Sequence, residues 1–366
     1  IGHLFNIVKN NFSKHLLRWY NSREREMPWR GETDLYKIWL SEVMLQQTQV
    51  KTVIPYYKRW IKRFPDTKSV AMATEDQVLK LWEGLGYYSR ARNFKSACEW
   101  IYYENNNKIP LNSDKFLGLK GVGEYIHAAV RSIALNEVIP VVDGNVKRVV
   151  SRLIELKTTP TKGLSKIKTF LNSVISSKFP GDFNQAMMDL GSTICKPRNP
   201  MCNTCCISRF CLANEHNSVN NFPLLDKKQK IPHKKIAVGV IWKNNKILIS
   251  KRKPNVMLGG LWEFPGGKIK KNETAEDCTI REIKEELNVG VSITEKITTI
   301  KHTYSHFTIE LTAFHCQFDY GTPKAIGCSD FRWISPIEFD SFAFPKANHK
   351  IFNQIPGKNP CTSYNQ

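Results

Sequence analysis

The length, composition and charge of the chain exclude some classes of protein. With 366 residues, 41% of them hydrophobic and 24% charged, the chain is long enough for two domains with ordinary cores. No run of about eighteen apolar residues occurs, which argues against a membrane-spanning helix. The net charge of +21 favours a polyanionic partner over small acidic substrates, and the plainer alternative is a solubility charge from a lysine-rich composition.

Residues 1–213 carry the pattern of an all-helical domain. The chain opens with an amphipathic stretch, 1–20, that no signal-peptide cleavage pattern follows, so a cytoplasmic location is expected, at the nucleoid if the protein is bacterial. Further along, apolar residues recur every three or four positions, which predicts helices. The clearest segments are 34–50, 76–101 and 145–156.

The pattern changes after Cys211. Residues 214–234 are polar, with two prolines and a lysine run, and indicate a linker. Across 235–355 the apolar period becomes two, with a hairpin predicted to turn at Asn244-Asn245 and one helix predicted within the domain. The chain is therefore predicted to join an all-helical domain to a smaller α+β domain, with 356–366 as a tail.

Two carboxylates stand where acid–base chemistry could use them. Glu42 lies in an apolar stretch, where facing a pocket would raise its pKa and make it a general acid near neutral pH; an exposed polar-face residue is the plainer alternative. Asp143 directly precedes a predicted helix, where an N-cap is equally plain. Cleavage of an N-glycosidic bond needs an acid for the leaving base and a negative charge beside the cationic sugar, so two such carboxylates suit it.

A glycine turn lies between these two carboxylates. Gly121 and Gly123 in "LKGVGEYIHAAV" open a predicted helix, which suits close approach to a phosphate, although a plain turn explains the pattern as well. Glu124 at this turn is an acid where a phosphate would approach.

Five of the ten cysteines lie in one loop, 195–211. The spacing contains a single close pair, whereas structural zinc usually takes two, so an iron–sulfur cluster is favoured over zinc and over a coincidence of thiols. A reducing compartment also favours metal over disulfides. The predicted ligands are Cys195, Cys202, Cys205 and Cys211, with Cys206 as an alternative to Cys205.

Together, "SEVMLQQT", "LKGVGEYIHAAV", "VDGNV" and the cysteine loop resemble the adenine DNA glycosylase (MutY) family of the helix-hairpin-helix/[4Fe–4S] glycosylases. The resemblance implies a helix-hairpin-helix at about 112–131 and a [4Fe–4S] loop that orders a basic surface against DNA. It also implies base-excision repair of adenine opposite 8-oxoguanine in duplex DNA, by a monomer. In this family the residue matching Glu42 protonates adenine and that matching Asp143 steadies the cation.

Further residues take roles only through this resemblance. Asn145 would orient Asp143, and Tyr125 would lie near the sugar; bifunctional relatives carry a lysine at its position, so a monofunctional enzyme is expected. A flipped adenine would be held by Trp29, Arg30 and Gln185. The predicted contacts to the partner base and backbone are Gln47, Thr48, Leu85, Tyr87, Gly121 and Gly123, and the basic residues of the cysteine loop are Lys196, Arg198 and Arg209.

The second domain contains a pattern that resembles the Nudix box, from Gly267 to Glu286. Glu282, Glu285 and Glu286 would share one helix face and hold Mg²⁺, and Asn288 replaces the glycine that usually ends the helix. In the MutY family this domain typically lacks the acids and reads 8-oxoguanine.

"HTYSHF" resembles the element that reads the lesion, with Tyr304, Ser305 and His306. Two interpretations of the domain stay open: a lesion reader that retains an ancestral box, or a domain that also hydrolyses an oxidised nucleotide such as 8-oxo-dGTP. For the whole chain, a non-catalytic iron–sulfur DNA-binding protein is a further alternative.

Overall fold

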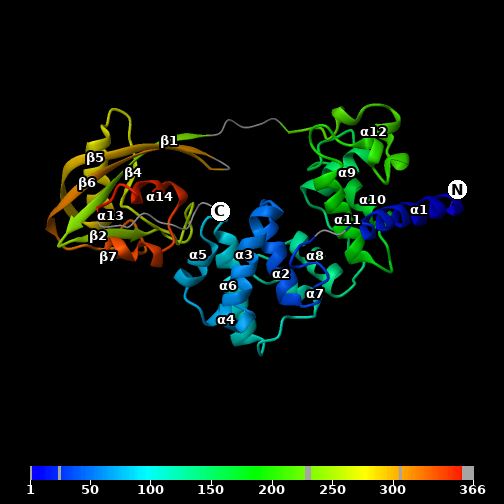
Figure 1. The fold of residues 1–366 in the computed structure, drawn as a ribbon, viewed down its shortest axis with the longest axis horizontal. Coiled ribbons are helices and arrows are strands. Elements are labelled where there is room, and N and C mark those ends of the chain that lie inside the picture. The colour runs from blue at the N-terminus through cyan, green and yellow to red at the C-terminus, as the bar shows by residue number, and fades with distance from the viewer. Residues whose placement is uncertain (1, 24–25, 227–231, 305–306, 357–366) are drawn as a thin grey trace. The chain divides into compact units, whose positions relative to one another are not determined.

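The computed structural model of the chain separates into two compact units (Figure 1). Unit 1 comprises Ile1–Ala71 and Ser96–Lys228, and unit 2 comprises Met72–Lys95 and Gln229–Gln366. The structure describes residues 2–23, 26–226, 232–304 and 307–356, with side chains from residue 11 onward. Residues 72–95 therefore group with the C-terminal part of the chain, while the domain boundaries at 213 and 235 stay predictions.

Unit 1 is helical in its described residues, as the apolar spacing predicts. One buried cluster joins α1, α9, α10 and α11 and includes Phe12, Val149 and Phe183. The helices are α1 (Gly2–Asn21), α2 (Leu35–Leu45), α3 (Val50–Arg63), α4 (Thr67–Met72), α7 (Ser113–Leu117), α8 (Glu124–Ala134), α9 (Gly144–Leu153), α10 (Leu164–Val174), α11 (Pro180–Thr193) and α12 (Leu212–Glu215), with short 3₁₀ turns at Cys202–Thr204, Ser208–Phe210 and Val219–Asn221.

Two of the predicted helical segments are interrupted. The segment 34–50 ends as a helix at Leu45, and α3 begins only at Val50. The segment 76–101 divides into α5 (Glu75–Trp82) and α6 (Ser89–Glu104), because Gly84 and Gly86 between them have φ values of +92° and +77°. Apolar spacing continues across both breaks, so periodicity alone could not locate them.

Unit 2 is built on one mixed sheet. The strands are β1 (His233–Lys243), β2 (Lys246–Lys251), β3 (Trp262–Glu263), β4 (Gly266–Lys268), β5 (Val289–Thr303), β6 (Thr308–Gly321) and β7 (Asp330–Ile334). Their order is β3-β2-β1-β6-β5, with β4 paired to β1 and β7 to β2. β1 and β6 run parallel, and the other pairs are antiparallel.

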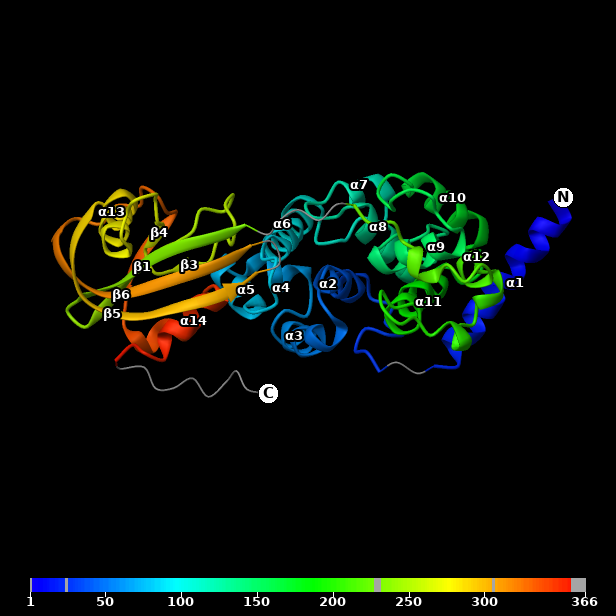
Figure 2. The same cartoon turned by 90° about the horizontal axis from the view of Figure 1, so that it is seen from above.

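Helices cover both faces of this sheet. Figure 2 shows α13 (Ala275–Leu287) on one face and α14 (Lys346–Phe352) on the other. Alternate residues of β1 serve the two sides: Ala237 and Ile241 pack with α13, and Val238 and Val240 belong to the cluster that contains α14.

Two local predictions in unit 2 are confirmed. Asn244 and Asn245, both with positive φ, form the two-residue turn between β1 and β2. Asn288 ends α13 in the left-handed conformation, at φ 58° and ψ 33°. In the part of the chain that the structure describes, no helix has the length and apolar character needed to cross a membrane.

Candidate active site

Glu42 is buried at the centre of unit 1. It lies on α2, which Asp34 caps through the backbone N–H of Lys37, and only 4% of Glu42 is exposed. The phenol of Tyr125, from the first turn of α8, donates to the Glu42 carboxylate at 2.6 Å. Burial raises the pKa of Glu42, and the Tyr125 hydrogen bond opposes this only in part. The exposed-face alternative for Glu42 is therefore wrong.

Asp143 is the N-cap of α9, in agreement with the plainer of its two predicted roles. Its carboxylate caps α9 by accepting from the backbone N–H of Val146 at 2.6 Å, and it also accepts from the Asn145 side-chain amide at 3.0 Å. The Arg148 guanidinium donates a hydrogen bond to the oxygen of the Asn145 side-chain amide at 2.8 Å. The prediction that Asn145 orients Asp143 thus has a geometric basis in this structure.

The two carboxylates lie within electrostatic reach of each other. Both raise the pKa of Tyr125, and Asp143 also raises the pKa of Glu42. Burial raises the pKa of Asp143 as well, but hydrogen bonds from Val146 and Asn145 and the charge of Arg148 oppose that shift. Glu42 has the larger apolar burial and Asp143 has more donors, so the proton is better placed on Glu42 and the charge on Asp143.

The predicted base-binding residues Arg30 and Gln185 are in direct contact. The Arg30 guanidinium donates to the Gln185 side-chain oxygen and forms an ion pair with Asp189 at 2.8 Å, both on α11. It also donates to the Tyr20 phenol at 2.6 Å. Arg30 Nε is buried and has no hydrogen-bond partner among the described residues, which leaves one donor for a ligand. The positive charge of Arg30 also lowers the pKa of Glu42, against the larger effect of burial.

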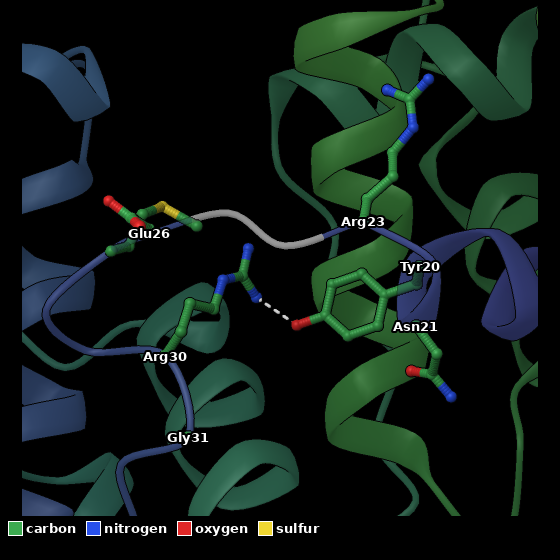
Figure 3. Close-up of a pocket in the computed structure, with 7 residues that line it drawn as sticks. Tyr20, Asn21, Arg23, Glu26, Arg30 and Gly31 are labelled. Atoms are coloured by element: carbon green, nitrogen blue, oxygen red, sulfur yellow. Dashed lines mark hydrogen bonds between the residues drawn. The ribbon is translucent and has the colours of Figure 1, made fainter.

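A cavity of about 460 Å³ opens beside Arg30 (Figure 3). It is lined by Tyr20, Asn21, Arg23, Glu26, Met27, Arg30 and Gly31. Trp29 does not line it; its ring is buried edge-on against Tyr57, with ring centroids 5.2 Å apart.

The glycine turn has the geometry of a hairpin between α7 and α8. Gly121 has φ +85°, a conformation that favours glycine, and Gly123 is the N-cap of α8 with open space where a Cβ would stand. Glu124 forms an ion pair with Lys168 of α10 at 2.9 Å, so its charge is partly neutralised. The acid at this turn is thereby no obstacle to an approaching phosphate.

The other predicted DNA-contacting residues lie on two turns. Gln47 is exposed and has φ +55°, in the turn between α2 and α3, and Thr48 beside it is half-buried. In unit 2, Tyr87 is half-buried in the loop between α5 and α6, while Leu85 is only 5% exposed. Leu85 is thus packed into the protein in this structure.

The cysteine loop brings four thiols into one neighbourhood. Cys195 acts electrostatically on Cys202, Cys205 and Cys211, whereas the thiol of Cys206 is influenced by Arg23 and by its own backbone. Among the described residues, no three His, Cys, Asp or Glu side chains converge closely enough to hold one metal ion.

The cysteine loop is joined to α9, the helix that Asp143 caps. Arg148 donates to the Cys195 carbonyl at 2.8 Å, and Arg152 donates to the Cys195 sulfur at 3.2 Å and to the Lys196 carbonyl at 2.8 Å. Lys196, Arg198 and Arg209 are exposed around the loop. The Cys195 sulfur faces the positive charge of Arg152, and three basic side chains are exposed around the loop. Both features fit a loop that binds a cluster and presents a basic surface.

The three acids of the Nudix-like box share α13 as predicted, and Arg281 engages two of them. Arg281 pairs with Glu273 at 2.5 Å, with Glu282 at 2.8 Å and with Glu285 at 3.1 Å. A Cβ on Gly267 would meet the Glu282 carboxyl at 2.3 Å, so this glycine makes room for the acid. Burial and the nearby Glu263 and Glu282 raise the pKa of Glu286 to about 8.

Of the predicted lesion-reading residues, Ser305 and His306 lie outside the described residues. Tyr304 stacks on Phe307, with centroids 4.6 Å apart; burial raises the pKa of its phenol to about 12, and the nearby Ala347 backbone opposes that rise. Both Tyr304 and Glu286 lie within electrostatic reach of Arg252 and Glu263, which form an ion pair at 2.6 Å.

Three residues of this site were missed from the sequence. Tyr20 and Asp189 complete the coordination of Arg30, and Arg148 secures Asn145. Asp189 follows Gln185 by one helical turn, and Arg148 follows Asn145 by three residues, so helical spacing from the recognised residues was the available signal.

Family models match two parts of the chain. Residues 40–172 match the HhH-GPD superfamily of base excision DNA repair proteins, and residues 237–354 match the NUDIX domain. Among solved structures, a thermostable thymine-DNA glycosylase has a TM-score of 0.53 at 25% identity and covers 58% of this chain and 98% of its own. A trapped endonuclease III–DNA intermediate has a TM-score of 0.50 at 18% identity over 58% of this chain and 98% of its own, which shows a shared fold.

Curated relatives cover most of the chain. The adenine DNA glycosylase of Buchnera aphidicola from Schizaphis graminum is 35% identical over 82% of this chain and 86% of its own length. The human adenine DNA glycosylase is 30% identical over 98% of this chain and 77% of its own length.

Proposed function

The chain belongs to the adenine DNA glycosylase family, and from that premise we propose that it removes adenine paired with 8-oxoguanine from duplex DNA by hydrolysing the N-glycosidic bond. The observation that carries the proposal is the carboxylate pair of buried Glu42, with its Tyr125 hydrogen bond, and half-buried Asp143, with its Asn145 and Val146 donors. Tyr125 has no amine to form an imine with the sugar, so the proposed enzyme is monofunctional.

The two carboxylates would divide the chemistry. Protonation of the departing adenine needs an acid that still holds its proton near neutral pH, and the raised pKa of Glu42 supports that role. As the base leaves, positive charge develops on the sugar, and an ionised Asp143 would stabilise it electrostatically. The donors around Asp143 favour its charged form and fix its direction.

The base pocket would form around Arg30. An extruded adenine presents acceptor and donor groups at its edge, and Arg30 Nε and the Gln185 amide are the polar groups held ready at this place. The ion pair with Asp189 keeps the guanidinium oriented before the base arrives.

A [4Fe–4S] cluster is proposed at Cys195, Cys202, Cys205 and Cys211. Four neighbouring thiols, one of them bonded by Arg152, form a suitable donor set. The cluster would cross-link a loop that otherwise contains only short 3₁₀ turns among its described residues, and so hold Lys196, Arg198 and Arg209 toward the DNA backbone.

The substrate proposal predicts a preference that single-turnover excision measures. Adenine opposite 8-oxoguanine should be removed roughly tenfold or more faster than adenine opposite thymine, because hydrogen bonds to the oxidised base are made with one duplex only. Equal rates on the two duplexes would contradict the lesion specificity while leaving adenine excision itself intact.

A second activity of the α13 acids is also proposed: hydrolysis of an oxidised nucleoside triphosphate to the monophosphate and pyrophosphate. It is supported by Tyr304 and Glu286 bordering the same ion pair, Arg252–Glu263, so that a nucleotide whose base met Tyr304 could extend its phosphates toward α13. Carboxylate oxygens of Glu282, Glu285 and Glu286 are ligands that Mg²⁺ prefers, and Mg²⁺ would neutralise the phosphates.

This second activity predicts release of pyrophosphate from 8-oxo-dGTP with Mg²⁺, lost in Glu285→Gln. The matched control is Glu276→Gln, which changes an exposed acid in the first turn of the same helix. No release above background would leave the domain as a lesion reader alone, and equal release by both variants would remove Glu285 from the proposed metal site.

A further inference from the structure

The loop between α5 and α6 is held by the C-terminal sheet domain. Asp76 of α5 accepts from the Trp262 indole at 3.1 Å and pairs with Lys251 at 2.8 Å. At the other end of the loop, Arg92 of α6 donates to the carbonyls of Gly259 and Pro254. Residues 72–95 and the sheet therefore form one body, in which α5 lies beside α14 (Figures 1 and 2).

Glu83 makes the most deeply buried of these connections. It directly precedes the loop, is 3% exposed, and accepts from the Phe344 backbone N–H at 2.7 Å and from His349 Nε2 at 2.8 Å. Lys80 pairs with it at 2.7 Å. Although burial acts to raise the pKa of Glu83, His349 and Lys80 hold it below its usual range. A buried carboxylate with three partners fixes the start of the loop in one position.

The loop itself is stiff, so a fixed start determines where its side chains lie. Arg90 donates to the Gly86 carbonyl at 3.0 Å and stacks on Tyr87, with its guanidinium carbon 5.4 Å from the ring centroid. The Trp82 indole donates to the same carbonyl at 3.0 Å. The Tyr88 phenol accepts from the Gly84 backbone N–H at 3.0 Å. A displacement of Glu83 would therefore move Tyr87 with it.

Helix α14 connects this anchor to the candidate lesion reader. Its Ala347 backbone lies close enough to the Tyr304 phenol to oppose the rise in the pKa of that phenol, and two residues further on His349 binds Glu83. The helix is short and rigidly packed, with Ala347, Ile351 and Phe352 buried in the same cluster. Tyr304 and the loop that carries Tyr87 therefore both contact α14. Tyr304 does so beside Ala347, and the loop does so through the pair of Glu83 and His349.

We propose that Glu83 and His349 are positioning residues that fix the Tyr87 loop relative to the Tyr304 reading element, so that both engage the same base pair. This rests on the proposed recognition of 8-oxoguanine. A contact of Tyr304 with the lesion would then affect the position of the Tyr87 loop, which would face the stacked bases of the duplex. Reading of the lesion would thereby be coupled to extrusion of the adenine.

The test is His349→Ala, measured by single-turnover excision on duplexes with adenine opposite 8-oxoguanine and opposite guanine. We expect a loss of about three- to thirtyfold on the 8-oxoguanine duplex, with a smaller loss opposite guanine, so the ratio of the two rates falls. His349→Gln, whose amide can still donate to Glu83, should restore most of the ratio. The matched control is His315→Ala on β6, because His315 accepts from the Trp242 indole at 3.0 Å and, among the described residues, forms no hydrogen bond or ion pair with α14 or Glu83.

A second measurement separates positioning from a loss of folding. In a double-mutant cycle, Tyr304→Phe and His349→Ala should be less than additive in the rate ratio, because both interrupt one connection. Proportional losses on both duplexes, or full additivity, would overturn the positioning role. If the unmodified protein does not distinguish the two duplexes, the recognition of 8-oxoguanine fails and this inference with it.

Discussion

Replacing Glu42 by Gln is expected to abolish adenine excision and to stabilise the folded protein. Loss of a general acid costs about a hundred- to ten-thousandfold in rate. The folded protein raises the pKa of Glu42 by burial, so ionising this carboxylate costs more in the folded than in the unfolded chain. Glutamine removes that cost while its amide can still meet the Tyr125 phenol, and the free energy of unfolding should rise by roughly 1 kcal/mol at neutral pH.

The pH dependence has a definite sign. Because the folded pKa lies above the unfolded one, the destabilisation is fully present above the folded pKa and vanishes below the unfolded pKa. The stability gain of Glu42→Gln, measured by denaturant unfolding, should therefore shrink as the pH falls, and excision by the unmodified protein should decline as the pH rises through the pKa of Glu42.

Glu32→Gln is the matched control for Glu42→Gln. Glu32 pairs with Lys37 at 2.9 Å, and hydrogen bonds from Lys37 and the backbone hold its pKa below the ordinary value. The same substitution there should leave excision unchanged and give no stability gain. Unchanged excision in Glu42→Gln would remove Glu42 from the acid role, and a stability loss would contradict its unfavourable burial.

The sequence predicts the chemistry of this site better than its geometry. Residue types and local spacing led to Glu42, Asp143 and the cysteines, because an acid in an apolar stretch, a helix cap and a thiol cluster are local signals. That Glu42 approaches Asp143 depends on the packing of α2 and α8 and on the start of α9, which no local pattern encodes.

The same limit applies to the fold. Helices and strands follow from apolar periods of 3.6 and 2, and the turn at Asn244-Asn245 from its residue types. The allocation of residues 72–95 to the C-terminal unit depends instead on contacts such as Glu83 with His349, far apart in the chain. The base pocket is a further example, because Arg30 and Asp189 can form their ion pair only once α11 has packed beside the Arg30 segment.

Cys205→Ser and Cys206→Ser are expected to differ sharply, although the two thiols are neighbours in the chain. The Cys205 thiol is within electrostatic reach of Cys206, Cys195 and Cys211, and Cys195 also acts on Cys202 and Cys211, whereas the charge that acts on the Cys206 thiol is that of Arg23. Cys205→Ser should therefore lose iron and the brown visible absorbance, and Cys206→Ser should keep both. The measurements are iron per chain, visible absorbance and the affinity for duplex DNA.

The consequence for DNA binding follows from the architecture of the loop. Ile207 is the one buried residue of the segment 195–211, so this segment has little apolar packing to order it without a metal cross-link. Disorder there would disperse Lys196, Arg198 and Arg209, so Cys205→Ser should bind DNA more weakly and with a shallower dependence on salt. Bound zinc in place of iron in the unmodified protein would reject the cubane cluster. Iron retained by Cys205→Ser and lost by Cys206→Ser would reverse the ligand assignment, because the thiol that faces Arg23 would then have to turn toward Cys195 when the metal binds.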